Sequence, residues 1–151
     1  MKDYRIRAAA REDCPRMLEL IRDLAEYEKA PEKVVVSLWE FEESGFGSSP
    51  VWWGYVAEDG SGRVCGFALC YVRYSTWRGR CSYLEDIYVK PEHRGGGAGS
   101  MLFDRIVADA RERGYAGVVW QVLDWNEPSI DFYRRRGADL DPEWINCSIY
   151  F

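Results

Sequence analysis

Residues 83–102 have the sequence YLEDIYVKPEHRGGGAGSML, in which an apolar segment leads into a cluster of glycines. This pattern predicts a strand over residues 81–89, a loop over 91–99 and a helix over 100–113. Consecutive glycines allow successive backbone N–H groups to point at one anion, and the N-terminus of the following helix adds partial positive charge. We therefore expect the loop to hold a pyrophosphate, with Arg94 as an additional cation.

Two other phosphate-binding motifs do not fit this loop. A dinucleotide-binding turn places its glycines directly after the strand, whereas four residues, Lys90 to His93, intervene here. A P-loop requires Gly-Lys-Ser or Gly-Lys-Thr, which the chain lacks. Glycine content alone would also fit a plain flexible turn, so the surrounding sequence has to decide between the two interpretations.

The flanking sequence predicts further strands and helices on both sides of this unit. Before it we expect a strand, two helices and a hairpin, and after it a strand, a helix and a last strand. The predicted ranges are 4–7, 13–24, 37–43, 51–57 with 64–74, 117–123, 126–136 and 144–151. Strands first, then strands alternating with helices, indicate an α/β fold with a mixed sheet covered by helices, in a single domain over residues 1–151.

The composition narrows the class of protein and of partner. The chain has 151 residues, 47% of them hydrophobic and 30% charged, as in globular domains, and its formal net charge is -5. This charge argues against a nucleic-acid partner and suits a cationic substrate. The five cysteines form no CxxC pair, and no apolar run is long enough to span a membrane. We expect free thiols in a protein of the cytoplasm, without a membrane partner.

The chain resembles the GNAT superfamily of N-acetyltransferases. The loop signature of that family, Arg or Gln, two residues, Gly, one residue, then Gly or Ala, is met by Arg94, Gly97 and Gly99. Tyr27-Glu28, the YLED of residues 83–86 and the NEPSIDFYRRRGA of residues 126–138 are similar to the branch that acetylates spermidine, spermine and thialysine. The resemblance implies a mainly antiparallel, mixed central sheet flanked by helices on both faces, acetyl-CoA as the cosubstrate, a small cationic amine as the substrate, and a homodimer.

The resemblance also assigns residues to the site. By resemblance, Tyr27 and Glu28 would contribute to the amine site. Strand alternation, by contrast, points Asp86 to the face opposite Glu85, where it would help to recognise a distal amine. The positions expected to hold acetyl-CoA are Ile87, Tyr88, Val89, Arg94, Gly95, Gly96, Gly97, Ala98, Gly99, Ser100, Asn126, Pro128, Ser129 and Tyr133.

The chemistry of amine acetylation predicts two catalytic residues. An alkylamine with a pKa of about 10 is protonated at neutral pH, so a carboxylate has to accept its proton, directly or through water. Glu85, on an otherwise apolar strand, is the candidate, since burial would raise its pKa and its charge would attract the ammonium group. Tyr133 is the candidate acid that protonates the leaving thiolate, a role that the family resemblance favours over that of a core aromatic. A strand N–H near Ile87 would stabilise the oxyanion.

Other chemistry has less support in the sequence. His93 is expected to be a solvated loop residue, so a Cys–His nucleophile is disfavoured and direct transfer is expected. No cluster of His and Cys has metal-ligand spacing, and no metal is expected. Two further functions stay open: a GNAT enzyme that acetylates protein or peptide amines, and a non-catalytic acetyl-CoA-binding module.

Overall fold

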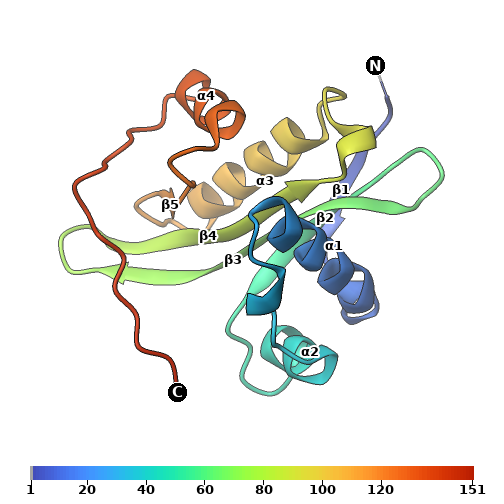
Figure 1. The fold of residues 1–151 in the computed structure, drawn as a ribbon, viewed down its shortest axis with the longest axis horizontal. Helices are drawn as coiled ribbons and strands as arrows, with labels where there is room; N and C mark the ends of the chain where they lie inside the picture. Colours follow the sequence, from blue (N-terminus) through green and yellow to red (C-terminus); the bar gives the residue numbers. More distant parts are fainter. Residues whose placement is uncertain (1) are drawn as a thin grey trace. The chain divides into compact units, whose positions relative to one another are not determined.

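Antiparallel pairing joins the first four strands of the sheet in chain order, and a fifth strand then pairs in parallel with the fourth (Figure 1). The computed structural model describes residues 2–151. These fall into two units, one through Gln121 and one over Val122–Phe151, which are described separately. The elements of the first unit are β1 (Arg5–Ala8), α1 (Cys14–Tyr27), α2 (Leu38–Phe46), β2 (Trp53–Glu58), β3 (Val64–Ser75), β4 (Gly79–Val89), α3 (Ala98–Glu112) and β5 (Val118–Trp120), with short 3-10 turns at Arg11–Asp13, Pro31–Lys33 and Pro91–His93. The predicted mixed, mainly antiparallel sheet is confirmed.

Helices cover both faces of this sheet, as predicted. On one face, Met17 and Leu20 of α1 and Phe41 of α2 pack against Val56 of β2 and Phe67 of β3. On the other face, α3 buries its apolar side against β2, β3 and β4, as Figure 1 shows. Because successive side chains of a strand point to opposite faces, β2 and β3 contribute to both cores.

A buried carboxylate attaches α3 to β2. Asp109 accepts hydrogen bonds from Trp53 Nε1 at 3.1 Å and from the Tyr55 hydroxyl at 2.9 Å. Its ionic partner is Arg113, one turn along α3, whose Nε lies 2.9 Å from Asp109 Oδ2 and whose guanidinium stacks on the Trp53 ring at 4.0 Å. A buried charge is costly unless it is paired and hydrogen-bonded, and here both conditions are met.

Several predicted boundaries differ from the structure. The second helix was expected to end near residue 43, but α2 continues through Gly45, where the close approach of the Trp52 ring leaves no room for a Cβ. α3 begins two residues before its predicted start, and β5 spans only three of the seven predicted residues. The predicted last strand over 144–151 is wrong. In the part of the chain that the structure describes, no strand pairs with it, and a strand without a neighbour is not stable in water.

The second unit contains the predicted helix. α4 (Glu127–Arg135) follows Asn126, has Pro128 in its first turn, and ends before Gly137, which adopts a φ of 80°. Among the described residues, no helix is both long and apolar enough to cross a membrane.

Asp109→Ala tests how strongly its carboxylate holds α3 on the sheet. Because the substitution leaves two buried donors and a guanidinium without their acceptor, it should lower the free energy of unfolding by about 3 kcal/mol. Glu112→Ala is the matched control on the same helix, since Glu112 pairs with Arg105 at the surface and should change stability by less than about 1 kcal/mol. Urea unfolding of both variants measures the difference, and equal losses would contradict this role for Asp109.

Candidate functional site

A β-bulge in β4 organises the site. Leu69 of β3 lies opposite Asp86, and the next residue, Cys70, lies opposite Leu84, so Glu85 is an extra residue in the ladder. A bulge breaks the alternation of side chains between the two faces of the sheet. Glu85 is exposed as a result, whereas Asp86 is partly buried.

The pairing of β4 with β5 stops at the same point. β5 pairs with Ser82, Tyr83 and Leu84 and, among the described residues, with none beyond them. The edge of β4 from Glu85 to Val89 therefore has no neighbouring strand on the β5 side. Alternate backbone N–H and C=O groups of Ile87–Val89 are available there to an extended ligand, apart from Val89 O, which accepts a hydrogen bond from Arg94 Nε. These are strand positions predicted to hold acetyl-CoA.

The glycine loop presents a row of backbone donors. In the described chain, no amide from Gly95 to Ser100 donates to another backbone group, and Met101 is the first to do so, to Gly97 O at 2.9 Å. Gly95 and Gly97 have φ angles of 77° and 97°, which disfavour any residue with a side chain. Together with the N-terminus of α3, these amides form a site suited to an anion such as a pyrophosphate.

Arg94 connects this loop to α1 and β4. Its Nε donates to Val89 O at 2.9 Å, and its guanidinium lies 5.5 Å from the ring centroids of both Tyr27 and Tyr88. The expected cation is therefore beside the loop, and the end of α1 is brought next to it. The contact of Arg94 with Tyr27 could not be predicted from the sequence, because no spacing rule relates residues so far apart in the chain.

Three carboxylates gather near the bulge. Burial, with smaller contributions from the negative charges of Glu85 and Glu28, raises the pKa of Asp86 to about 7. Burial also raises the pKa of Glu28, with a second contribution from Glu85. The expectation that Glu85 itself is buried is wrong: at the bulge Glu85 is exposed, and it is Asp86 that is partly buried.

The first unit brings together the predicted amine-site residues Tyr27, Glu28, Glu85 and Asp86 with β4 and the glycine loop. The remaining predicted positions, Asn126, Pro128, Ser129 and Tyr133, lie on α4 or at its N-terminus in the second unit. Their place in the site, and the role of Tyr133 as an acid, remain predictions.

Comparison with known proteins agrees with this geometry. The sequence profile of the Acetyltransferase (GNAT) family matches residues 7–138. The chain belongs to the GNAT acetyltransferase family.

Similar proteins include acetyltransferases with small amines in their names. A bovine thialysine N-epsilon-acetyltransferase is 44% identical over 140 residues, which cover 88% of this chain and 82% of the bovine protein. The human spermidine/spermine N(1)-acetyltransferase-like protein 1 is 34% identical over 95% of this chain and 22% of its own length. A solved aminoglycoside acetyltransferase from an uncultured soil sample has the same fold, with a TM-score of 0.79 at 17% identity over 98% of this chain and 96% of its own.

The buried thiols Cys14 and Cys70 give no support to a covalent mechanism in this acetyltransferase. Burial raises the pKa of Cys14 to about 11 and that of Cys70 to about 12, which keeps both protonated and unreactive at neutral pH. His93, expected to be solvated, is partly buried and contacts Tyr4 and Asp59. Within residues 2–151, no three His, Cys, Asp or Glu side chains are grouped so that they could bind a metal ion.

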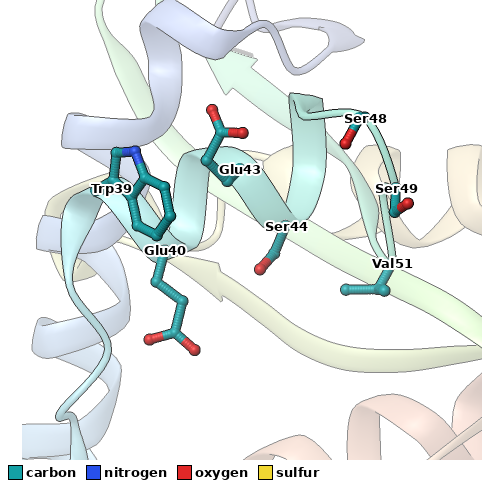
Figure 2. A pocket seen from close by; sticks show the side chains of 7 residues that line it. All are labelled: Trp39, Glu40, Glu43, Ser44, Ser48, Ser49 and Val51. Atoms are coloured by element: carbon teal, nitrogen blue, oxygen red, sulfur yellow. The ribbon is translucent and has the colours of Figure 1, made fainter.

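A separate open pocket of about 230 Å³ lies along α2 and the segment that follows it (Figure 2). None of the predicted site residues lines it. Its acidic wall is partly neutralised, because Glu43 accepts a hydrogen bond from Arg11 at 3.0 Å. The lining residues are Trp39, Glu40, Glu43, Ser44, Ser48, Ser49 and Val51.

The raised pKa of Asp86 makes a prediction about stability. The folded state holds the Asp86 proton up to about pH 7, whereas the unfolded chain loses it near the ordinary value of 3.8, so stability falls as the pH rises through this window. The free energy of unfolding of Asp86→Asn minus that of wild type should therefore be larger at pH 8 than at pH 5, by on the order of 2 kcal/mol.

Urea unfolding of wild type and Asp86→Asn at both pH values measures this difference. Glu112→Gln is the control, because Glu112 is an exposed carboxylate that does not contribute to the raised pKa of Asp86. If the stability difference between wild type and Asp86→Asn did not change with pH, the raised pKa would be wrong.

Proposed function

We propose that this acetyltransferase moves the acetyl group of acetyl-CoA directly onto a primary amine of a small cationic substrate, such as a diamine, a polyamine or a lysine-like amine. The observation that carries this proposal is the group of three carboxylates, Glu28, Glu85 and Asp86, near the strand edge and loop that fit the cosubstrate. A negative cluster in a partly buried setting attracts an ammonium group. The names of the thialysine and spermidine/spermine relatives support the same class of substrate.

The chain has groups suited to the pyrophosphate and to the pantetheine arm of acetyl-CoA. The amides of Gly95–Ser100 would receive the pyrophosphate, with Arg94 beside them, and the free edge of Ile87–Val89 would bind the pantetheine arm. Bound there, acetyl-CoA supplies a thioester, an acyl group open to attack by a neutral amine. By family resemblance, Asn126, Pro128 and Ser129 would complete the cofactor site.

We propose that Asp86, rather than Glu85, accepts the proton of the ammonium group. A base is most effective when its pKa is near the working pH, and the pKa of about 7 meets this condition. Glu85, exposed and adjacent, would attract the substrate and keep the pKa of Asp86 high. Tyr133 would donate a proton to the departing thiolate, and a backbone N–H near Ile87 would stabilise the oxyanion.

The assembly and compartment are also part of the proposal. The resemblance to the polyamine branch supports a homodimer, which light scattering tests. The acidic net charge supports the absence of a nucleic-acid partner, and the free cysteines, four of them buried, support a reducing cytoplasm.

A panel of amines tests the function. Release of coenzyme A thiol from acetyl-CoA should rise with diamines, polyamines or lysine analogues and stay near background with peptides. Tyr133→Phe should lower kcat by about 100-fold or more if Tyr133 is the acid, whereas Tyr150→Phe, a matched control in the second unit, should not. Release with peptides alone would favour the protein-modifying alternative, and tight binding without turnover would favour a non-catalytic module.

The dependence of rate on pH separates the two candidate bases. With one amine throughout, kcat/KM should rise with pH to a plateau above about 7, because Asp86 has to be ionised. Asp86→Asn should abolish this limb and reduce kcat/KM by about 100-fold or more. Glu85→Gln should keep the limb and move it to lower pH, because it removes a neighbouring negative charge. If the limb disappears in Glu85→Gln instead, Glu85 is the base.

A further inference from the structure

The outer side of the glycine loop is held by the N-terminal segment of the chain. The Tyr4 hydroxyl donates to the carbonyl oxygen of His93 at 3.1 Å, and Lys2 Nζ donates to the carbonyl oxygen of Glu92 at 2.9 Å. Both acceptors belong to the 3-10 turn Pro91–His93, which leads directly into the loop. Tyr4 immediately precedes β1, so these bonds connect the loop to the sheet.

The Tyr4 ring also fills the space that a side chain at Gly96, the middle glycine of the three, would need. A Cβ built on Gly96 would lie 2.9 Å from both Tyr4 Cε2 and the Tyr4 hydroxyl oxygen, closer than real Cβ contacts. Gly95 and Gly97 have open space around them and are constrained by their φ angles instead. The three consecutive glycines therefore serve two purposes: the outer two set the path of the backbone, and the middle one admits Tyr4.

A second contact holds the same turn from the β2–β3 hairpin. His93 Nε2 lies 3.7 Å from Asp59 Oδ2, and the His93 ring packs edge-on against Tyr4 with centroids 5.9 Å apart. Asp59 is itself fixed, because its Oδ1 accepts hydrogen bonds from the Ser61 amide at 2.9 Å and from the Arg63 amide at 3.1 Å. Tyr4 and Asp59 thus hold His93 between the start of β1 and the β2–β3 turn.

We propose that Tyr4 is a positioning residue for acetyl-CoA: it holds the loop so that the amides of Gly95–Ser100 converge on the pyrophosphate before the cosubstrate binds. This inference rests on the proposed function, because it assumes that the loop binds acetyl-CoA. A loop ordered in advance loses less conformational entropy on binding, so affinity rises without any contact between Tyr4 and the ligand. Burial raises the pKa of Tyr4, so its hydroxyl stays a donor through neutral pH.

The first test removes the Tyr4 hydroxyl. Tyr4→Phe keeps the ring against Gly96 and removes the donor to His93. It should weaken coenzyme A binding about three- to tenfold, the range of one hydrogen bond, and should raise the KM for acetyl-CoA more than it lowers kcat. Titration calorimetry with coenzyme A measures the first effect. Hydrogen exchange of the free protein should show faster exchange over residues 92–100. Tyr74→Phe, an exposed tyrosine on β3, is the matched control.

A double-mutant cycle tests the contact with Gly96. Gly96→Ala should weaken coenzyme A binding in the wild-type background, where the new methyl group meets the Tyr4 ring. In the Tyr4→Ala background this steric conflict is gone, so the same substitution should have a smaller effect. A general loss of stability would not produce this dependence on background, and urea unfolding identifies the conditions in which all variants are folded.

These experiments distinguish a failure of the proposed role of Tyr4 from a failure of the proposed function. If wild type does not bind coenzyme A, the proposed function fails and the role of Tyr4 fails with it. If wild type binds, but Tyr4→Phe binds equally well and exchanges loop amides at the wild-type rate, the role of Tyr4 is overturned and the function stands. Equal effects of Gly96→Ala in the two backgrounds would also overturn it.

Discussion

The end of the β4–β5 pairing at Leu84 is the constraint on which the candidate site depends. Up to that residue β4 is an interior strand with neighbours on both sides, and beyond it the edge facing β5 is free. The bulge at Glu85 lies at this same point. The free strand edge and a partly buried carboxylate, Asp86, therefore lie side by side, which is the arrangement on which the proposed proton transfer depends.

The two faces of the sheet support different ends of the site. On one face, α1 packs through Met17 and Leu20, and its C-terminal end carries Tyr27 and Glu28 toward β4. On the other face, α3 is fixed to β2 through Asp109, and its N-terminus follows the glycine loop. The amine side and the cofactor side thus rest on separate helices, and the sheet keeps them in register.

Much of this arrangement could be predicted from local sequence. The strand, loop and helix of residues 83–102 follow from periodicity and glycine content, since both signals are local. The bulge could not be predicted, because it depends on the register between β3 and β4, and perfect alternation was assumed instead. This is why burial was assigned to Glu85 and not to Asp86. The contacts of Tyr4 with Gly96 and of Arg94 with Tyr27 join distant segments and follow only from the folded chain.

The prediction of a last strand over residues 144–151 is wrong for a related physical reason. Residues 144–151 contain aromatic and β-branched side chains typical of strands, but a strand also requires a partner to accept its hydrogen bonds. Propensity is a property of the segment, whereas pairing is a property of the fold. The same distinction explains why β5 is shorter than its apolar run: its pairing with β4 is limited to Ser82–Leu84.

The three carboxylates, Glu28, Glu85 and Asp86, show how a site can favour proton transfer at some cost to the stability of the fold. Asp86 is held near Glu28 and Glu85, and both burial and repulsion favour its protonated form. When an ammonium group enters, its positive charge offsets the repulsion, but the partial burial remains. Burial disfavours the ion pair of ammonium and carboxylate relative to the neutral pair of amine and carboxylic acid. The environment that destabilises ionised Asp86 in the free protein is therefore the one that would draw the proton from the amine and leave it able to attack the thioester.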